Sequence, residues 1–510
     1  MQWLNDIVDE AVRRRPEGEI IVSSGVSPSG VYHLGTLREV MTAEAIAAEL
    51  IRRGRKARHL HIVDDLDVLR KVPAGISADF EKQLGKPLCD VPSPDGKAAS
   101  YADYFLNDLV LAAKELKLKM VIVRSHEKYR AGFFVPAIEK TLESLDQIKK
   151  ILIQVSGRSL DEQWSPVQVI EDGYLKTRQF VSLDKAAQTL EYQDNEGKKN
   201  SIGYAKGDVK LNWRIDWPAR WWLLKVDVEP FGRDHATKGG SYDTGAAIAR
   251  KVFGIEPPLP LPYAFINRTG ETKKMSKSAG DTITAAELMK ILPPEAVWYF
   301  LLRYAPDKQL FFDSGPTLIR LFDEFAELLS KPKKTADDEQ LIELCTGSVA
   351  KLTISTIPFS HLVASYQAAL KDPELTLEII GRSEYSSAAK EEAETIKREL
   401  KFIDRWLEAY APTEAKFELS EAVDSGAFTD VQKDYLNKLA DKITTAPKTA
   451  DGEWFHKAIY GLAEEVGVVP KDLFMALYKA LIGQSSGPRA GWFLSILPRE
   501  WLISRLRLEG

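Results

Sequence analysis

The chain has 510 residues, enough for about three domains, and its apolar and charged fractions of 44% and 28% are those of ordinary globular proteins. Its net charge of −5 excludes nucleic-acid recognition through bulk charge, so a nucleic-acid partner would have to meet basic residues gathered on one face. The only two cysteines, Cys89 and Cys345, exclude a disulfide framework. No apolar run approaches the ~20 residues of a membrane span, so we expect a cytoplasmic protein.

The first distinctive segment of the chain is a loop of small residues between a predicted strand and a predicted helix. The apolar run 19–24 predicts a buried parallel strand, and helical spacing of apolar residues begins at Val40. This order places unpaired N–H groups and the positive end of a helix dipole at the loop, where phosphate binds well. We expect His33 to donate to a phosphate oxygen and adenine to lie on Gly35. The alternative is a tight turn in which the histidine only caps the helix.

Carboxylates follow the second predicted strand, at residues 58–63. Asp64, Asp65 and Asp67 come directly after it, and ligands bind at the carboxyl ends of the strands in open α/β sheets. The alternative is a solvated turn that caps the next helix. A loop rich in Pro, Gly and Ser (74–100), a helix (101–116) and a strand (119–124) complete a second βαβ step, which predicts the first half of a Rossmann-type nucleotide-binding domain.

Residues 125–210 interrupt this pattern. Helical stretches around 133–153 are followed by short alternating runs, and Asp194 to Gly197 is a hairpin turn signal. We interpret the segment as an inserted α+β module that splits the sheet. It contains no cysteine, so we expect no structural zinc.

The sheet is expected to resume at Leu211, in a stretch dense in tryptophan. Strands are predicted at 226–230 and 258–267, and the first ends next to Arg233, Asp234 and His235. Strand signals are absent from about 285 onwards, where helical patterns take over. We therefore divide the chain into a first Rossmann half (1–124), the insertion (125–210), a second half (211–285), connecting helices (286–335) and a helical domain (336–510).

A polar loop after the last predicted strand holds Lys273, Lys274 and Lys277 among small residues. Alone, such a run is usually a solvated loop. Together with the first loop, it resembles the two signature sequences of class I aminoacyl-tRNA synthetases. His33 to Thr36 resembles the His-Ile-Gly-His signature, with Leu and Thr at its second and fourth places, and Lys274 to Ser278 matches the Lys-Met-Ser-Lys-Ser signature in full.

Within that class, the chain is similar to the class I lysyl-tRNA synthetases. Four passages of the catalytic half carry this similarity: 24–39 (SGVSPSGVYHLGTLRE), 64–73 (DDLDVLRKVP), 210–221 (KLNWRIDWPARW) and 229–244 (EPFGRDHATKGGSYDT). The resemblance implies that the helical region 336–510 binds the anticodon. As an alternative, a terminal helical domain serves only to oligomerise or to stabilise the protein.

The resemblance also implies roles for individual residues. His33, Lys274 and Lys277 would be catalytic. The ATP-binding residues would be Pro28, Ser29, Gly30, His33, Gly35, Thr36, Lys274, Met275, Ser276, Lys277 and Ser278. The lysine pocket would contain Gly25, Ser27, Trp213, His235 and Tyr263, although tryptophans at this density are more often core residues. To these we add Asp216 as a partner for an ammonium group, because a buried ammonium requires a carboxylate or several acceptors.

The activity implied is that of a lysine–tRNA ligase, which uses ATP to form lysyl adenylate and transfers the lysyl group to tRNA-Lys. We expect Mg²⁺ to be bound through ATP, and neither a membrane nor DNA as a partner. Two alternatives remain open from the sequence. One is another class I synthetase, such as a glutamyl-type enzyme, and the other is a catalytically inactive tRNA-binding paralogue.

Overall fold

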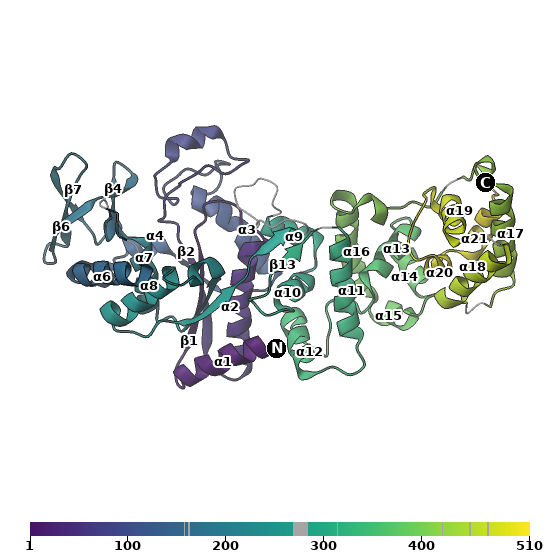
Figure 1. Ribbon diagram of the computed structural model, residues 1–510, viewed down its shortest axis with the longest axis horizontal. Coiled ribbons are helices and arrows are strands. Elements are labelled where there is room, and N and C mark those ends of the chain that lie inside the picture. Colours follow the sequence, from purple (N-terminus) through teal and green to yellow (C-terminus); the bar gives the residue numbers. More distant parts are fainter. Residues whose placement is uncertain are drawn as a thin grey trace. The chain divides into compact units, whose positions relative to one another are not determined.

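The computed structural model describes residues 1–510 except for 158, 162–163, 269–283, 314, 421, 448–449, 467–468 and 510 (Figure 1). The chain divides into two compact units. The first comprises Met1–Met289 and Phe300–Phe311, and the second comprises Lys290–Tyr299 and Phe312–Gly510. Lys274, Met275, Ser276, Lys277 and Ser278, the predicted second signature, lie outside the described residues.

A five-stranded sheet is the centre of the first unit. Its strand order is β11-β10-β1-β2-β3, and each neighbouring pair is parallel. The strands are β1 (Ile20–Val26), β2 (Ala57–Val63), β3 (Val121–Arg124), β10 (Val228–Gly232) and β11 (Leu259–Tyr263). The predicted Rossmann-type sheet is confirmed. Because β1 lies between β2 and β10, the direction of winding reverses beside β1, and the carboxyl ends of these strands meet there.

Helices before and after the strands cover this sheet. α2 (Leu34–Arg52) packs on β1 and β2, and it is buried on almost every side, which explains its apolar composition. The other helical elements of the sheet region are α1 (Gln2–Arg14), η1 (Ala78–Gln83), α3 (Tyr101–Glu115), α7 (Trp213–Leu224), η2 (Arg233–Ala236), α8 (Ser241–Ile248), η3 (Ala249–Phe253) and α9 (Ala285–Ile291). β12 (Ile266–Arg268) and β13 (Leu310–Phe312) form a separate pair.

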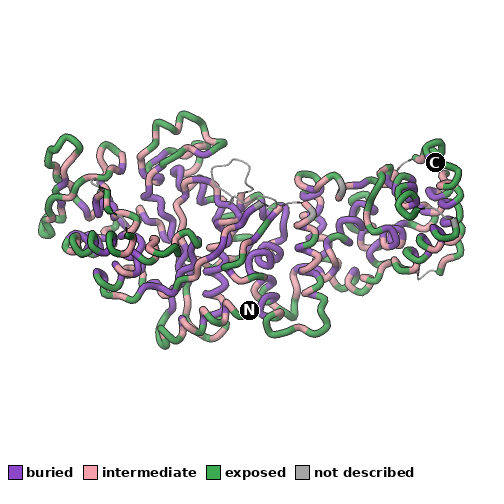
Figure 2. The backbone as a smooth tube through the Cα atoms, in the orientation of Figure 1, coloured by how far each residue is buried: buried purple, intermediate pink, exposed green. Residues whose placement is uncertain are grey.

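The predicted α+β insertion is present between β3 and β10. It contains α4 (Ser125–Arg130), α5 (Val135–Glu143), α6 (Leu145–Ser156), β4 (Val167–Glu171), β5 (Tyr174–Thr177), β6 (Gln179–Asp184), β7 (Thr189–Gln193), β8 (Lys199–Gly203) and β9 (Val209–Leu211). The strands form two antiparallel sheets, β5-β4-β9 and β6-β7-β8. Asp194 accepts backbone N–H groups in the turn between β7 and β8, so the predicted hairpin is confirmed. Exposed residues predominate in the β6-β7-β8 sheet of this insertion (Figure 2).

Three strand predictions were wrong in detail. The main sheet does not resume at Leu211, because β9 pairs with β4 in the insertion and the tryptophan-rich stretch then forms α7. Asn212 caps this helix by accepting the N–H of Arg214, which explains why the chain turns into a helix there. Strands also do not vanish after 285, since β13 follows at 310–312. The predicted strand 258–267 is divided into β11 and β12.

The second unit is built from helices, as predicted. These are α10 (Pro294–Leu302), α11 (Pro316–Ser330), α12 (Ala336–Thr346), α13 (Phe359–Ala368), α14 (Pro373–Ile380), α15 (Ser386–Glu391), α16 (Ala393–Ala409), η4 (Thr413–Ala415), η5 (Ser425–Ala427), α17 (Asp430–Thr444), α18 (Gly452–Val466), α19 (Pro470–Ile482), α20 (Ala490–Ile496) and α21 (Arg499–Leu506). Thr335 and Thr429 begin α12 and α17 with reciprocal capping boxes. No helix among the described residues has the length and apolarity needed to traverse a bilayer.

Candidate active site

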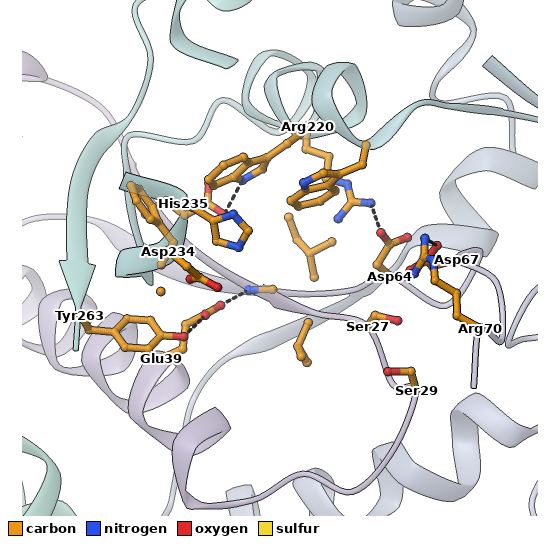
Figure 3. Close-up of a pocket in the computed structure, with 18 of the residues that line it drawn as sticks. Ser27, Ser29, Glu39, Asp64, Asp67, Arg70, Arg220, Asp234, His235 and Tyr263 are labelled. Atoms are coloured by element: carbon orange, nitrogen blue, oxygen red, sulfur yellow. Dashed lines mark hydrogen bonds and ion pairs between the residues drawn. The ribbon is translucent and has the colours of Figure 1, made fainter. Parts of the chain in front are cut away.

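A cavity of about 600 Å³ opens at the carboxyl edge of the main sheet, where β1 and β10 lie side by side (Figure 3). Segments far apart in the sequence line it, including the end of β1, the loop that follows, and the residues after β2 and β10. Open α/β sheets bind their ligands at this position because strand ends and helix starts converge there. The lining combines carboxylates, cations and aromatic rings.

Glu39, Asp234 and Tyr263 form one end of the cavity, which we call the acidic end. Glu39 projects from α2, and its carboxylate accepts the N–H of Gly25 at 2.8 Å and the hydroxyl of Tyr263 at 2.6 Å. Figure 3 shows Asp234 on the same side of the cavity as these two residues. Burial, and then the nearby Glu39 carboxylate, raise the pKa of Tyr263 well above its usual range, so the phenol stays protonated and donates.

An ion-pair network lies at the other end. Asp64 is 3.1 Å from Lys210 and 2.9 Å from Arg220. Burial alone would raise the pKa of Asp64, but Arg220 and Lys210 hold it well below its usual range. Asp67 accepts two hydrogen bonds from the Arg70 guanidinium, at 2.6 and 2.7 Å. This end therefore presents carboxylates and cations together.

An aromatic wall connects the two ends. Trp213, the first residue of α7, stacks on Trp217 with ring centroids 5.3 Å apart and planes at 13°. His235 approaches the edge of Trp217, with 5.5 Å between the ring centroids. Trp213 is 38% exposed whereas Trp217 is 4% exposed, so the first ring faces the open cavity and the second supports it. Such a surface suits an aliphatic stem or a cation.

The first predicted signature forms the start of α2. His33 is the N-cap residue, and its Nδ1 accepts the N–H of Gly35 at 3.0 Å. Because Nδ1 accepts, the ring proton belongs on Nε2, which is the tautomer that can donate to a phosphate oxygen. A Cβ at Gly35 would lie 2.8 Å from the imidazole Cε1, so the face of Gly35 expected to seat adenine is covered by His33 itself. This packing was not predicted, because His33 and Gly35 were given separate roles in the sequence analysis.

The predicted lysine-pocket residues lie together, with one exception. Gly25, Ser27, Trp213, His235 and Tyr263 all line the cavity, and so does Ser29 from the predicted ATP set. Asp216 does not line it. This residue is fully buried on α7, forms an ion pair with Arg220 and accepts the hydroxyl of Tyr129. Pro28, Gly30 and Thr36 lie in the same loop and at the helix start, outside the lining.

The three aspartates after β2 have different surroundings. Asp64 and Asp67 line the cavity, so neither lies in a solvated turn away from it. Asp65 instead accepts Arg124 at 2.5 Å and His126 at 2.7 Å, and it therefore fastens β2 to the start of α4.

Five charged lining residues were not identified from the sequence as site residues: Glu39, Arg70, Lys210, Arg220 and Glu229. A signal existed for two of them. Glu39 follows Gly35 by four residues on α2 and so lies on the same helix face. Glu229 is a charged residue within an otherwise apolar strand, where a carboxylate is costly unless it has a specific partner.

Comparison with known proteins matches both parts of the chain to protein families. A family model described as tRNA synthetases class I (K) matches residues 1–347, and a model described as an anticodon binding domain matches residues 365–508. The lysine–tRNA ligase 1 of Methanosarcina acetivorans is 38% identical, over 99% of this chain and 98% of that protein. The lysine–tRNA ligase of Archaeoglobus fulgidus is 35% identical over 99% of both chains, and that of Thermococcus kodakarensis is 32% identical over 100% of both.

Proposed function

The chain belongs to the class I tRNA synthetases of the lysine type, and from that premise we propose that the cavity at the sheet edge holds L-lysine while ATP activates it. The enzyme is a lysine–tRNA ligase, as its relatives along the whole chain support, and ATP use is a property of its family. The glutamyl-type and inactive alternatives have no specific observation in their favour.

We assign the two ends of lysine to the two ends of the cavity by charge. The α-ammonium and α-carboxylate of the amino acid form a zwitterionic group, which suits the mixed charges around Asp64, Lys210 and Arg70. The side-chain ammonium is an isolated cation and suits the acidic end. The four methylenes between them would lie along Trp213.

Glu39 carries this proposal. Its carboxylate is fixed by the N–H of Gly25 and the hydroxyl of Tyr263, so it is held ready for an ammonium group before lysine arrives. A preorganised carboxylate loses little freedom when it binds its ligand, which favours lysine over neutral side chains of similar length.

The chemistry follows from positioning and charge. The carboxylate of lysine attacks the α-phosphorus of ATP and pyrophosphate leaves. The 2′-hydroxyl of the terminal tRNA ribose then attacks the lysyl carbonyl, and AMP leaves. We propose that Nε2 of His33 donates to a phosphate oxygen and that Lys274 and Lys277 neutralise the leaving pyrophosphate. The loop Pro28–Gly30 and the start of α2 would face the phosphates, with Thr36 and Met275 to Ser278 as further ATP contacts.

We also propose how metal and tRNA are bound. The described residues contain no group of three His, Cys, Asp or Glu side chains suited to a metal ion, so a Mg²⁺ ion would be held through the phosphates of ATP. It would supply charge stabilisation there. The helical region matched by the anticodon binding domain would contact the anticodon of tRNA-Lys.

The test is charging of tRNA with each of the twenty amino acids by the full chain. We expect lysine alone to be attached to tRNA-Lys. Attachment of glutamate, or of no amino acid although lysine binds the protein, would contradict the proposal.

A further inference from the structure

A fifth carboxylate of the cavity, Glu229, has no place in the reaction described above. It is the second residue of β10, the strand beside the central β1, and only 6% of its surface is exposed. Among the described residues, no lysine or arginine forms a salt bridge with it. A buried carboxylate of this kind is unfavourable unless other groups compensate it, so its presence in the wall of the site requires an explanation.

Two indole groups compensate Glu229. Trp217 donates its Nε1–H to Oε1 at 3.0 Å, and Trp221 donates its Nε1–H to Oε2 at 2.5 Å. The two tryptophans are four residues apart on α7 and therefore face β10 from the same side of the helix. An indole N–H is only a donor, and the carboxylate offers each ring an oxygen of its own, whereas an amide has a single acceptor oxygen.

These contacts reach the cavity through Trp217. Its ring stacks on Trp213, which is exposed to the cavity, and it meets the edges of both Phe231 and His235. The orientation of Trp217 therefore determines the aromatic wall against which the stem of lysine would lie. Glu229 fixes that orientation through the hydrogen bond that it accepts from the indole N–H of Trp217.

We propose that Glu229 is a positioning and specificity residue of the lysine site: it aligns Trp217 and Trp221 through their N–H groups, and its negative charge favours a cationic amino acid. This inference rests on the proposed function, because it assumes that the cavity holds lysine. The positioning role and the electrostatic role are separable, since the first depends on accepting the two indole N–H groups and the second depends on ionisation.

Because Glu229 is buried, its ionisation depends on the charges of the groups around it. Burial raises the pKa of Glu229 to about 7, because the hydrogen bonds from Trp217 and Trp221 and the positive charge of Arg220 offset it only in part. The titratable groups around it are Arg220 on α7, Tyr242 on α8 and, across Trp217, His235 in η2. An ammonium group in the cavity adds positive charge and therefore favours the ionised form. Lysine binding should consequently release protons from the enzyme near neutral pH.

Calorimetric titration of the full chain with lysine tests this proposal. Experiments at pH 6, 7 and 8, in buffers of different ionisation heat, give the affinity and the number of protons released. If lysine lowers the pKa of Glu229 by one unit, affinity rises about fivefold from pH 6 to pH 8, and roughly 0.4 proton is released per lysine at pH 7. Glu229→Gln should abolish both effects and weaken lysine binding at pH 8 about tenfold.

Two further variants make the outcome decisive. Glu256→Gln alters an exposed glutamate that pairs with Arg250 outside the cavity, and it should behave as the wild type does. Trp221→Phe removes one donor from the carboxylate without removing the charge, so the pH midpoint of lysine binding should move upwards. This variant also provides the test if Glu229→Gln does not fold.

The outcomes separate this proposal from the proposed function. A Glu229→Gln protein that releases protons and depends on pH as the wild type does would overturn the role of Glu229, as would an unchanged midpoint in Trp221→Phe. A wild-type protein that binds no lysine at any pH would overturn the proposed function itself.

Discussion

His33 and Thr284 form an isolated antiparallel bridge, so the first described residue after segment 269–283 pairs with the histidine of the first signature. Next to it, the N–H of Ala285 donates to the carbonyl of Tyr32 at 2.6 Å. Class I chemistry requires the two signature segments to act on one ATP molecule. The bridge places Thr284, the residue that follows segment 269–283, directly beside the start of α2, where the first signature lies.

We expect Arg38 to influence both the stability of this region and the rate of catalysis. Its buried guanidinium donates to the carbonyls of Pro306 at 2.9 Å and Lys308 at 2.7 Å, and it also reaches Phe265, shortly before segment 269–283. We expect Arg38→Met to lower the free energy of unfolding by about 3 kcal/mol, because charged hydrogen bonds to buried carbonyls are lost. It should also reduce kcat for pyrophosphate exchange more than it raises KM for lysine. Arg58→Met, at an exposed arginine of β2 that pairs with the exposed Glu19, is the control and should change stability by under ~0.5 kcal/mol.

The role of Glu39 predicts a selective loss of affinity. In Glu39→Gln, one oxygen still accepts a hydrogen bond but the charge is gone. Since a hydrogen bond to a charged group contributes about 1.5–3 kcal/mol, KM for lysine in pyrophosphate exchange should rise about tenfold or more, whereas KM for ATP should stay within twofold. Tyr263→Phe removes only the hydroxyl that orients the carboxylate and should have a smaller effect in the same direction. An equal rise in both KM values would contradict the assignment.

A single substitution separates the two roles left open for His33. Asparagine also caps helices well, so His33→Asn should preserve α2 and the melting temperature. It removes the imidazole donor, and the loss of one such transition-state contact lowers the rate about 10²–10³-fold. Single-turnover formation of lysyl adenylate measures this effect. A His33→Asn enzyme of full activity would mean that the histidine serves only as a cap.

The second unit contains a carboxyl group with a predictable pH dependence. Burial raises the pKa of Glu399 to about 8, although its carboxylate accepts the N–H of Ser355 at 2.5 Å. The folded protein then holds a proton that the unfolded chain loses above its usual pKa near 4.5. Stability should therefore fall by about 1 kcal/mol per pH unit from roughly pH 5 to pH 8 and level off above that range.

Glu399→Gln provides the check on this pH dependence. The amide oxygen can still accept the N–H of Ser355, but it cannot ionise. Thermal unfolding of the full chain between pH 5 and pH 9 should show a weaker pH dependence in the variant, and higher stability than the wild type at pH 9. Identical profiles for the two proteins would show that Glu399 does not titrate in this range.

Much of the fold could be predicted because its determinants are local. The strand before Gly25 and the helix after Thr36 each follow from apolar spacing within one short segment. The turn chemistry of Asp194 to Gly197 is local as well. By contrast, the tryptophan-rich stretch was assigned to the sheet because its helical cap at Asn212 gave a weaker signal than its aromatic content did.

The candidate site was harder to predict, because its charges depend on distant partners. Asp64 and Lys210 are separated by 146 residues, and only the fold brings them together. Asp216 resembles a free carboxylate in the sequence, yet Arg220, one helical turn later, and Tyr129 occupy it. Glu39 was missed for the same reason, since its partner Tyr263 is 224 residues away in the sequence.

The most direct measurement is a crystal structure of the enzyme with a non-hydrolysable analogue of lysyl adenylate. We expect the side-chain ammonium of the analogue within about 3 Å of Glu39, at hydrogen-bond distance. Its methylenes should lie against Trp213, and its phosphate-mimicking group should face His33. A lysyl side chain directed towards Asp64, or bound outside this cavity, would contradict the account.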